Sequence, residues 1–283
     1  MIKIIADSTC DLSPELIEQH DISIIPLHIL LDEEEYLDGV NIGPDEIFKW
    51  ADENNTTPKT SAPALPDAME IMEPFLKDDG EVIVFTISET MSATIKVVEL
   101  AAENLNAADR VTCIESANLS TGIGLLVLAA ADMVKEGKSR QEIVTEIETL
   151  KPRVRTSFVL DTLIYLHRGG RCSGVAALAG AALKIHPKIV VKNGSMEASK
   201  KYRGKMKFVI MDYVKDMEED ILQANPKRIF ITHSGVEEET LKEIREYLQG
   251  MGRFEEILLT RAGGVISSHC GPGCIGVFFI AGN

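Results

Sequence analysis

Short apolar runs alternate with longer amphipathic segments through the first half of the chain. Runs such as Ile2–Ala6 and Val82–Thr86 are rich in β-branched residues and too short for helices, which indicates buried strands. The alternation predicts a mostly parallel sheet covered by helices on both faces. The predicted strands are Ile2–Ala6, Ile22–Leu31, Val82–Thr86 and Val111–Glu115, and the predicted helices are Pro14–His20, Pro44–Asn54, Asp67–Lys77, Ser92–Asn104, Leu119–Lys135 and Arg140–Lys151.

The second half has a more mixed pattern, which predicts an α/β domain with a mixed or antiparallel sheet. Asn193-Gly194 lies between two strand-like runs and is a strong signal for a β-hairpin turn. Lys151-Pro152-Arg153 interrupts the helical pattern, so we expect an N-terminal α/β/α domain at residues 1–154 and a second domain at 155–283. The expected strands are Thr156–Leu160, Pro187–Lys192, Met196–Tyr202, Arg228–Thr232, Glu255–Leu259 and Ile275–Ala281, and the expected helices are Thr162–His167, Val175–Leu183, Val209–Gln223 and Glu237–Gln249.

The composition argues against several classes of protein. The 283 residues are 45% hydrophobic and 26% charged, as is typical of a globular chain. The net charge of −15 argues against binding to nucleic acid or to an anionic membrane, because both require a basic face. Five scattered cysteines and the lack of a signal peptide favour reduced thiols in the cytoplasm. The longest apolar stretches are too short for an integral membrane segment.

Polar loops follow several predicted strands, at the edge where open α/β sheets bind their ligands. Asp7-Ser8-Thr9, Thr60-Ser61-Ala62-Pro63 and the loops at residues 87–94 and 115–118 all present hydroxyl groups. Hydroxyls combined with the N–H groups of a helix start suit an oxyanion. Each loop taken alone is better explained as an ordinary N-cap or turn. Four such loops at strand ends favour a binding site.

The motifs of self-sufficient enzymes are absent from the sequence. There is no G-x-G-x-x-G after the first strand, no G-x-x-x-x-G-K-[ST], no G-x-S-x-G and no H-E-x-x-H. Cys270-x-x-x-Cys274 beside His269 resembles half of a zinc site, but no second ligand pair accompanies it. We therefore expect neither a metal nor a cofactor.

Longer sequence strings are more distinctive than any single loop. They are Asp7-Ser8-Thr9-Cys10-Asp11-Leu12, Tyr36-Leu37-Asp38-Gly39, Thr60-Ser61-Ala62-Pro63, Leu160 through Arg171, and the closing His269-Cys270-Gly271-Pro272-Gly273. As an ordered set they make the chain resemble the DegV family, the fatty-acid-binding proteins that serve as acyl carriers to a bacterial fatty acid kinase. One departure concerns the third loop, where the family usually has Leu-Ser-Gly-Thr-Tyr and this chain has Met91-Ser92-Ala93-Thr94-Ile95. The serine is kept, so the departure affects the shape of the pocket.

The resemblance implies both a fold and a function. The expected fold is a two-domain DegV-like α/β arrangement, with a buried tunnel between the domains that holds one long-chain fatty acid. Its carboxylate is expected to contact Thr60, Ser61 and Ser92, while Arg171 and His269 orient the head group or stabilise charge as an acyl phosphate forms. The protein is then a carrier and not an enzyme, and a separate fatty acid kinase performs the phosphorylation.

Several of these residues also have an alternative role. Arg171 could instead brace a loop, and His269 could be a structural histidine beside a glycine turn; His233, at a strand end, is interpreted as structural. In a second function class, Ser92, Arg171 and His269 belong to a small-molecule enzyme that acts on a carboxylate or phosphate substrate. A third possibility is a lipid-regulated protein that acts on other macromolecules.

One basic cluster stands out in this acidic chain. Such a run is usually the solvated rim of a hairpin, whereas its functional alternative is a docking surface for an acidic kinase, with Arg203 as the principal contact. The cluster consists of Lys200, Lys201, Arg203, Lys205 and Lys207.

Overall fold

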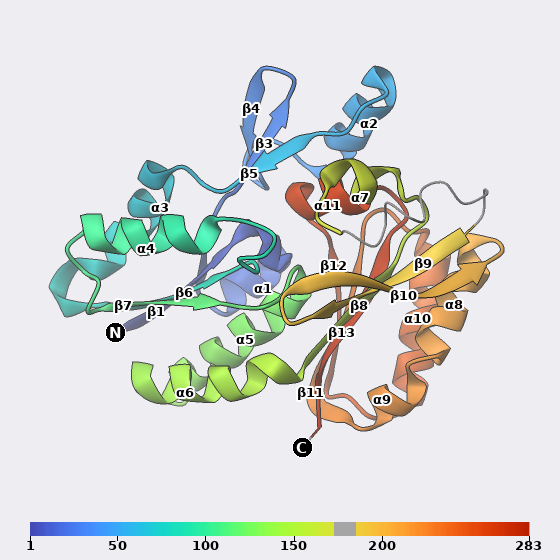
Figure 1. Ribbon diagram of the computed structural model, residues 1–283. Coiled ribbons are helices and arrows are strands. Elements are labelled where there is room, and N and C mark those ends of the chain that lie inside the picture. Colours follow the sequence, from blue (N-terminus) through green and yellow to red (C-terminus); the bar gives the residue numbers. More distant parts are fainter. Residues whose placement is uncertain (173–184, 283) are drawn as a thin grey trace.

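The computed structural model describes residues 1–172 and 185–282, which form a four-stranded, a six-stranded and a three-stranded β-sheet (Figure 1). The predicted helix Val175–Leu183 lies outside these residues. All strand pairs of the four-stranded sheet are parallel, as predicted. Its strands are, in spatial order, β2 (Ile22–Ile25), β1 (Ile2–Asp7), β6 (Glu81–Thr86) and β7 (Val111–Glu115).

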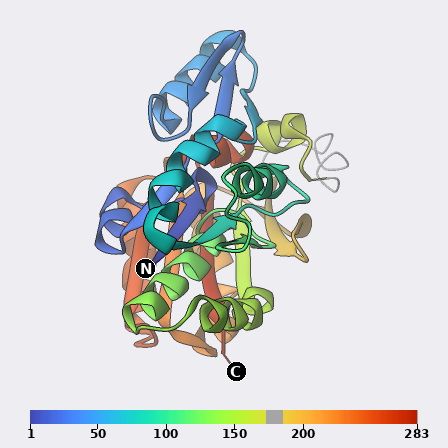
Figure 2. The same cartoon turned by 90° about the vertical axis from the view of Figure 1, so that its left-hand side faces the viewer.

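Helices cover both faces of the four-stranded sheet (Figure 2). Val82 and Val84 of β6 pack towards one helix layer, whereas Ile83 and Phe85 pack towards the other, because successive strand residues point to opposite faces. The first layer contains α3 (Leu65–Met72) and α4 (Thr94–Asn104), and the second contains α1 (Pro14–Gln19), α5 (Thr121–Lys135) and α6 (Arg140–Leu150). Short 3₁₀ helices occupy η1 (Ser8–Cys10), η2 (Glu73–Asp79) and η3 (Lys151–Arg153).

The six-stranded sheet is mixed. Its neighbouring strands are antiparallel except for the last two, which are parallel. Asn193 and Gly194 have φ angles of 48° and 77°, so the predicted hairpin turn is confirmed. The strands are, in spatial order, β10 (Ser195–Arg203), β9 (Ile185–Lys192), β8 (Val154–Val159), β13 (Ile275–Ala281), β11 (Ala224–His233) and β12 (Glu256–Arg261), and the helices packed on one face are α8 (Met206–Lys215), α9 (Glu218–Leu222) and α10 (Glu238–Gly250).

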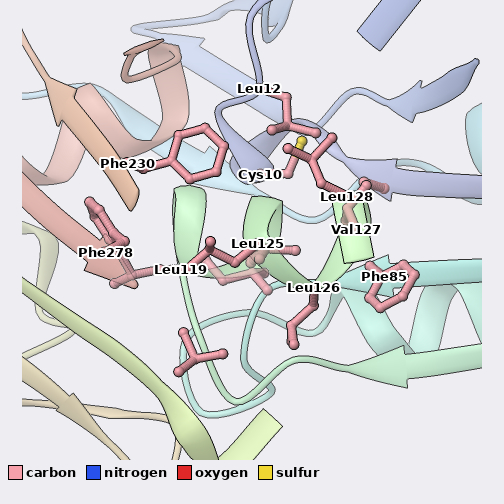
Figure 3. Close-up of a cluster of buried hydrophobic side chains, with 14 of the residues drawn as sticks. Cys10, Leu12, Phe85, Leu119, Leu125, Leu126, Val127, Leu128, Phe230 and Phe278 are labelled. Atoms are coloured by element: carbon pink, nitrogen blue, oxygen red, sulfur yellow. The ribbon is translucent and has the colours of Figure 1, made fainter. Parts of the chain in front are cut away.

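Helix α5 joins the two large sheets. Its residues Leu125–Leu128 are all buried, and a helix that is apolar all round requires partners on every side. Figure 3 shows these residues between Phe85 of β6 and the pair Phe230 and Phe278 from β11 and β13. One continuous core thus connects the segments on either side of residue 154, the domain boundary predicted from the sequence.

The prediction of a single strand at Ile22–Leu31 is wrong. Pro26 separates β2 from β3 (His28–Leu31), and the next N–H, of Leu27, donates to Ser8 Oγ at 3.1 Å instead of to a strand. Strand β3 belongs to the small antiparallel sheet, which projects from the body of the molecule beside α2 (Figure 1). That sheet comprises β4 (Glu34–Leu37), β3 and β5 (Lys59–Ser61), and α2 is Pro44–Asn54.

Two further helix predictions need correction, and one helix was not predicted. The helix expected at Asp67–Lys77 is α-helical only to Met72, and the helix expected at Val209–Gln223 is divided into α8 and α9. The segment before the closing glycines, for which we predicted no helix, forms the seven-residue helix α11 (Gly264–Cys270). Its two serines and its glycine are weak helix formers, so tertiary contacts decide its conformation. Near it lies α7 (Ile164–Gly169), close to the predicted position.

His28 makes the stability of the small sheet dependent on pH. Its Nδ1 lies 2.6 Å from Glu35 on β4, and its Nε2 lies 2.7 Å from Asp67 on α3. Burial lowers the pKa of His28, but the two carboxylates outweigh burial and raise that pKa above its usual value. The pairing therefore stabilises the fold fully below about pH 6.5 and is lost as pH rises through the raised pKa.

We expect the difference in unfolding free energy between the unchanged chain and His28→Gln to shrink between about pH 5.5 and about pH 8.5. Urea unfolding at several pH values measures it. His167→Gln, at an exposed position on α7, serves as the control and is expected to show no comparable pH dependence. A His28→Gln difference that is constant across this range would contradict the assignment.

Candidate functional site

A cavity of about 280 Å³ lies where the small sheet, the strand ends of both large sheets and α11 meet. Its wall is formed by residues from segments that are far apart in the sequence, including β5, the loop after β6, β8, β13 and α11. The structure brings together on this wall all five residues that the sequence suggested: Thr60, Ser61, Ser92, Arg171 and His269.

The cavity has a polar, accessible rim and an apolar interior. Ser61 and Arg171 on the rim are exposed. Phe158, Leu166 and Phe278 on the inner wall are only 1–5% exposed. Among the described residues that line the cavity none is acidic, although the chain carries a net charge of −15. This arrangement suits a molecule with an apolar body and an anionic end.

Two buried carboxylates hold the start of α11 against the N-terminal segments. Asp11 accepts the N–H of Gly263 at 2.8 Å, and Asp38 accepts the N–H of Gly264 at 2.7 Å. A side chain at Gly264 would collide with Ile29, whose Cδ1 lies 2.7 Å from the position of a Cβ atom. Burial raises the pKa of both aspartates above the usual value. These contacts give a structural role to two of the distinctive sequence motifs, the one that contains Asp11 and the one that contains Asp38.

Held in this way, α11 places His269 against Thr60 of β5, with 2.8 Å between Nε2 and Oγ1. Burial and, secondarily, the positive charge of Arg171 lower the pKa of His269 to about 4, so the ring is neutral at neutral pH. Within the described part of the chain, the buried Nδ1 has no hydrogen-bond partner. Because a buried N–H without an acceptor is costly, we assign the single ring proton to Nε2. It then donates to Thr60, whose own hydroxyl proton is left for a ligand.

Gly169 leaves room for this histidine. A Cβ atom at position 169 would lie 2.3 Å from His269 Nδ1. The carbonyl of the same glycine accepts a hydrogen bond from the Arg171 guanidinium at 2.7 Å. Arg171 therefore braces the end of α7, as the structural alternative suggested, while it also lines the cavity.

The remaining predicted residues occupy defined positions. Ser92 lies in the loop between β6 and α4, where its N–H donates to the carbonyl of Ser88 at 3.1 Å and its hydroxyl lies 2.8 Å from that of Thr94. His233 accepts the N–H groups of Gly235 and Val236, which agrees with a structural role, although it also lines the cavity. Arg203 is exposed at the end of β10 and is not part of the wall.

Sequence reasoning missed the residues that form the apolar wall. Met91 and Met196 line it from the β6–α4 loop and from β10, and no local signal distinguishes them from ordinary core residues. Cys270 and Cys274 line it as well; their mutual hydrogen bond and burial raise the pKa of the Cys274 thiol well above its usual value.

Residues 1–172 and 185–282 contain no group of three His, Cys, Asp or Glu that could hold a metal ion. The same residues contain no helix that is both long enough and apolar enough to span a bilayer.

Removing the charge of Arg171 is expected to raise the pKa of His269 from its value of about 4, since a nearby cation disfavours the protonated ring. Imidazole ¹H–¹⁵N spectra of the unchanged chain and of Arg171→Gln, recorded across the acidic range, measure this pKa. The same spectra test the tautomer. A proton on Nδ1 at neutral pH would contradict the assigned hydrogen bond to Thr60.

The chain is similar to known proteins over nearly its whole length. The family model described as DegV matches residues 1–282. A DegV domain-containing protein of Caldanaerobacter subterraneus subsp. tengcongensis is 33% identical over 98% of each chain. A fatty-acid-binding DegV family protein from Thermus thermophilus has a TM-score of 0.90, with 31% identity over 99% of each chain. A stearic acid-binding protein from Eubacterium ventriosum has a TM-score of 0.85, with 27% identity over 99% of this chain and 98% of the other. By sequence and by its two-domain α/β fold, this chain belongs to the DegV family.

Proposed function

We propose that the protein binds one long-chain fatty acid, with its tail in the apolar interior of the cavity and its carboxylate at the rim. The observation that carries this proposal is the combination of hydroxyl donors at the rim, an apolar inner wall and no acidic residue among the described lining residues. The similar structures from Thermus thermophilus and Eubacterium ventriosum, described as fatty-acid-binding proteins, support it. In this proposal Thr60, Ser61 and Ser92 donate to the carboxylate, and Arg171 and His269 orient the head group.

The two ends of the ligand contribute differently to binding. About 14 methylenes at ~0.8 kcal/mol each give roughly 11 kcal/mol before the costs of association are subtracted. Each hydrogen bond to the ionised carboxylate adds about 1.5–3 kcal/mol. The apolar wall therefore supplies most of the affinity, and the hydroxyl groups determine which end of the ligand faces outward. The cavity of about 280 Å³ is slightly smaller than the usual range for small-molecule pockets, about 300–1,000 Å³.

We further propose that the protein is a cytoplasmic carrier whose bound fatty acid is phosphorylated by a separate kinase. The geometry gives less support to the enzyme alternative. The Ser92 hydroxyl bonds to Thr94 and not to a base, and His269 in its assigned tautomer donates to Thr60, so it does not act as a base towards that hydroxyl. A carboxylate held at an accessible rim, beside an arginine, suits transfer of a phosphoryl group from a partner.

Native mass spectrometry of the purified protein tests the binding proposal. We expect a copurifying fatty acid at about one per chain; an empty cavity together with intrinsic turnover of a small substrate would support the enzyme instead.

Ser92→Ala and Thr60→Val each remove one hydrogen-bond donor to the carboxylate. Each is expected to weaken fatty acid binding about 10–100-fold. Ser199→Ala on the exposed side of β10 is the matched control and should leave the affinity unchanged.

The structure sharpens the docking hypothesis for the basic cluster. Lys200 is paired with Asp216, and Lys207 with Glu239 and Glu243. Lys201, Arg203 and Lys205 form no ion pair with any residue in the described ranges and are exposed, so these three charges are available to a partner.

The double variant Lys201→Glu/Arg203→Glu is expected to lower the rate of acyl phosphate formation by a cognate kinase at least tenfold and to leave fatty acid binding intact. Lys49→Glu/Lys77→Glu makes the same change in net charge at exposed positions on α2 and η2 and serves as the control. Loss of fatty acid binding together with phosphorylation would refute the docking role.

A further inference from the structure

The tip of the β9–β10 hairpin contacts the loop that carries Ser92. The Thr90 hydroxyl donates to the carbonyl of Gly194 at 2.5 Å, and the Ser195 hydroxyl lies 3.5 Å from the same Thr90 oxygen. The two segments are 104 residues apart in the sequence. Thr90 is exposed, so this contact lies at the surface and not in the hydrophobic core.

Within the loop, Ser88 fixes the path of the chain towards Ser92. Its carbonyl accepts the N–H groups of Met91 and Ser92 at 2.9 and 3.1 Å, and its hydroxyl accepts the N–H of Thr90 at 3.3 Å. Its own N–H donates to the carbonyl of Asn118 at 2.9 Å. The loop is therefore one hydrogen-bonded turn, in which a displacement of Thr90 is passed on to Ser92 two residues later.

Because Gly194 has no side chain, the hairpin tip lies closer to this turn than a residue with a side chain would allow. A Cβ atom at position 194 would lie 2.5 Å from the hydroxyl oxygen of Ser88, and the φ of 77° is one that residues with a side chain rarely adopt. The tip is also tied to the ligand cavity, since Met196 of the same strand and Met91 of the loop both line its wall. The contact thus joins two parts of one wall.

We propose that the hairpin tip is a positioning element for the head-group serine, and that the hydrogen bond from Thr90 to Gly194 sets the place of the Ser92 hydroxyl on the cavity rim. This inference rests on the proposed contact between Ser92 and a fatty acid carboxylate. A hydrogen bond to a charged group depends steeply on distance and angle, so a donor held by a second contact binds the carboxylate better than a donor on a free loop. Thr90 acts through Ser92 and does not touch the ligand itself.

Thr90→Val keeps the shape of the side chain and removes its donor. We expect it to weaken binding of a long-chain fatty acid about tenfold and to change binding of the primary alcohol of equal chain length much less, because a neutral hydroxyl depends less on the Ser92 donor. The measurement is titration calorimetry of the delipidated protein with both ligands. Thr149→Val is the matched control, since Thr149 is also exposed and also donates to a backbone carbonyl, that of Glu146 on α6.

Gly194→Ala tests the other side of the contact. It is expected to reduce the preference for the acid over the alcohol, as Thr90→Val does. Gly137→Ala is its control: Gly137 has a φ of 79° but no atom within 4 Å of a Cβ, so it introduces the same backbone strain without displacing a neighbour. If Gly194→Ala fails to fold, the surface variant Thr90→Val still decides the question.

The possible outcomes separate this inference from the proposed function. If the unchanged chain binds the acid no better than the alcohol, the carboxylate contact itself is wrong. If the unchanged chain prefers the acid and Thr90→Val keeps that preference, or loses affinity for both ligands equally, the positioning role is overturned. The positioning role is supported if Thr90→Val loses affinity for the acid but not for the alcohol, and if Thr149→Val shows no such loss.

Discussion

The candidate site depends on two hydrogen bonds from the start of α11 to buried carboxylates. Asp11 follows η1 and Asp38 follows β4, and each accepts one N–H of the Gly263-Gly264 pair. A helix of seven residues is too short to be stable by itself, so these contacts and the packing around Gly264 fix where it lies. Its position in turn brings His269 within hydrogen-bonding distance of Thr60, 209 residues away.

His269 is neutral at neutral pH, so it contributes a hydrogen bond and not a positive charge to the rim. A protonated imidazole would add a positive charge, but burial opposes that charge and the guanidinium of Arg171 adds to the opposition. The ring therefore donates a hydrogen bond to Thr60. The hydroxyl of Thr60 can in turn donate a hydrogen bond to a ligand at the rim. In this way one histidine orients a hydroxyl while Arg171 remains the formal charge near the mouth.

The sequence predicted what depends on local pattern and missed what depends on tertiary contacts. The four parallel strands and the Asn193-Gly194 hairpin follow from apolar runs and from turn chemistry, and both are present. Pro26 was a readable break that the long β-branched run obscured, and α11 has no helical signal of its own. The five candidate residues lie on one cavity wall, but they were selected through family resemblance, since no spacing rule connects Thr60 with His269.

Strand β10 connects the hairpin tip, the cavity wall and the proposed docking residue Arg203. β10 begins at the hairpin tip beside Thr90, contributes Met196 to the cavity wall and ends at Arg203. At ~3.4 Å per residue its nine residues span roughly 27 Å between their first and last Cα atoms. A kinase that contacts Arg203 and also reaches a carboxylate near Ser92 must therefore cover most of this length. Such coverage requires an interface of ordinary size, about 800 Å² on each partner, and is too extensive for a contact limited to one arginine.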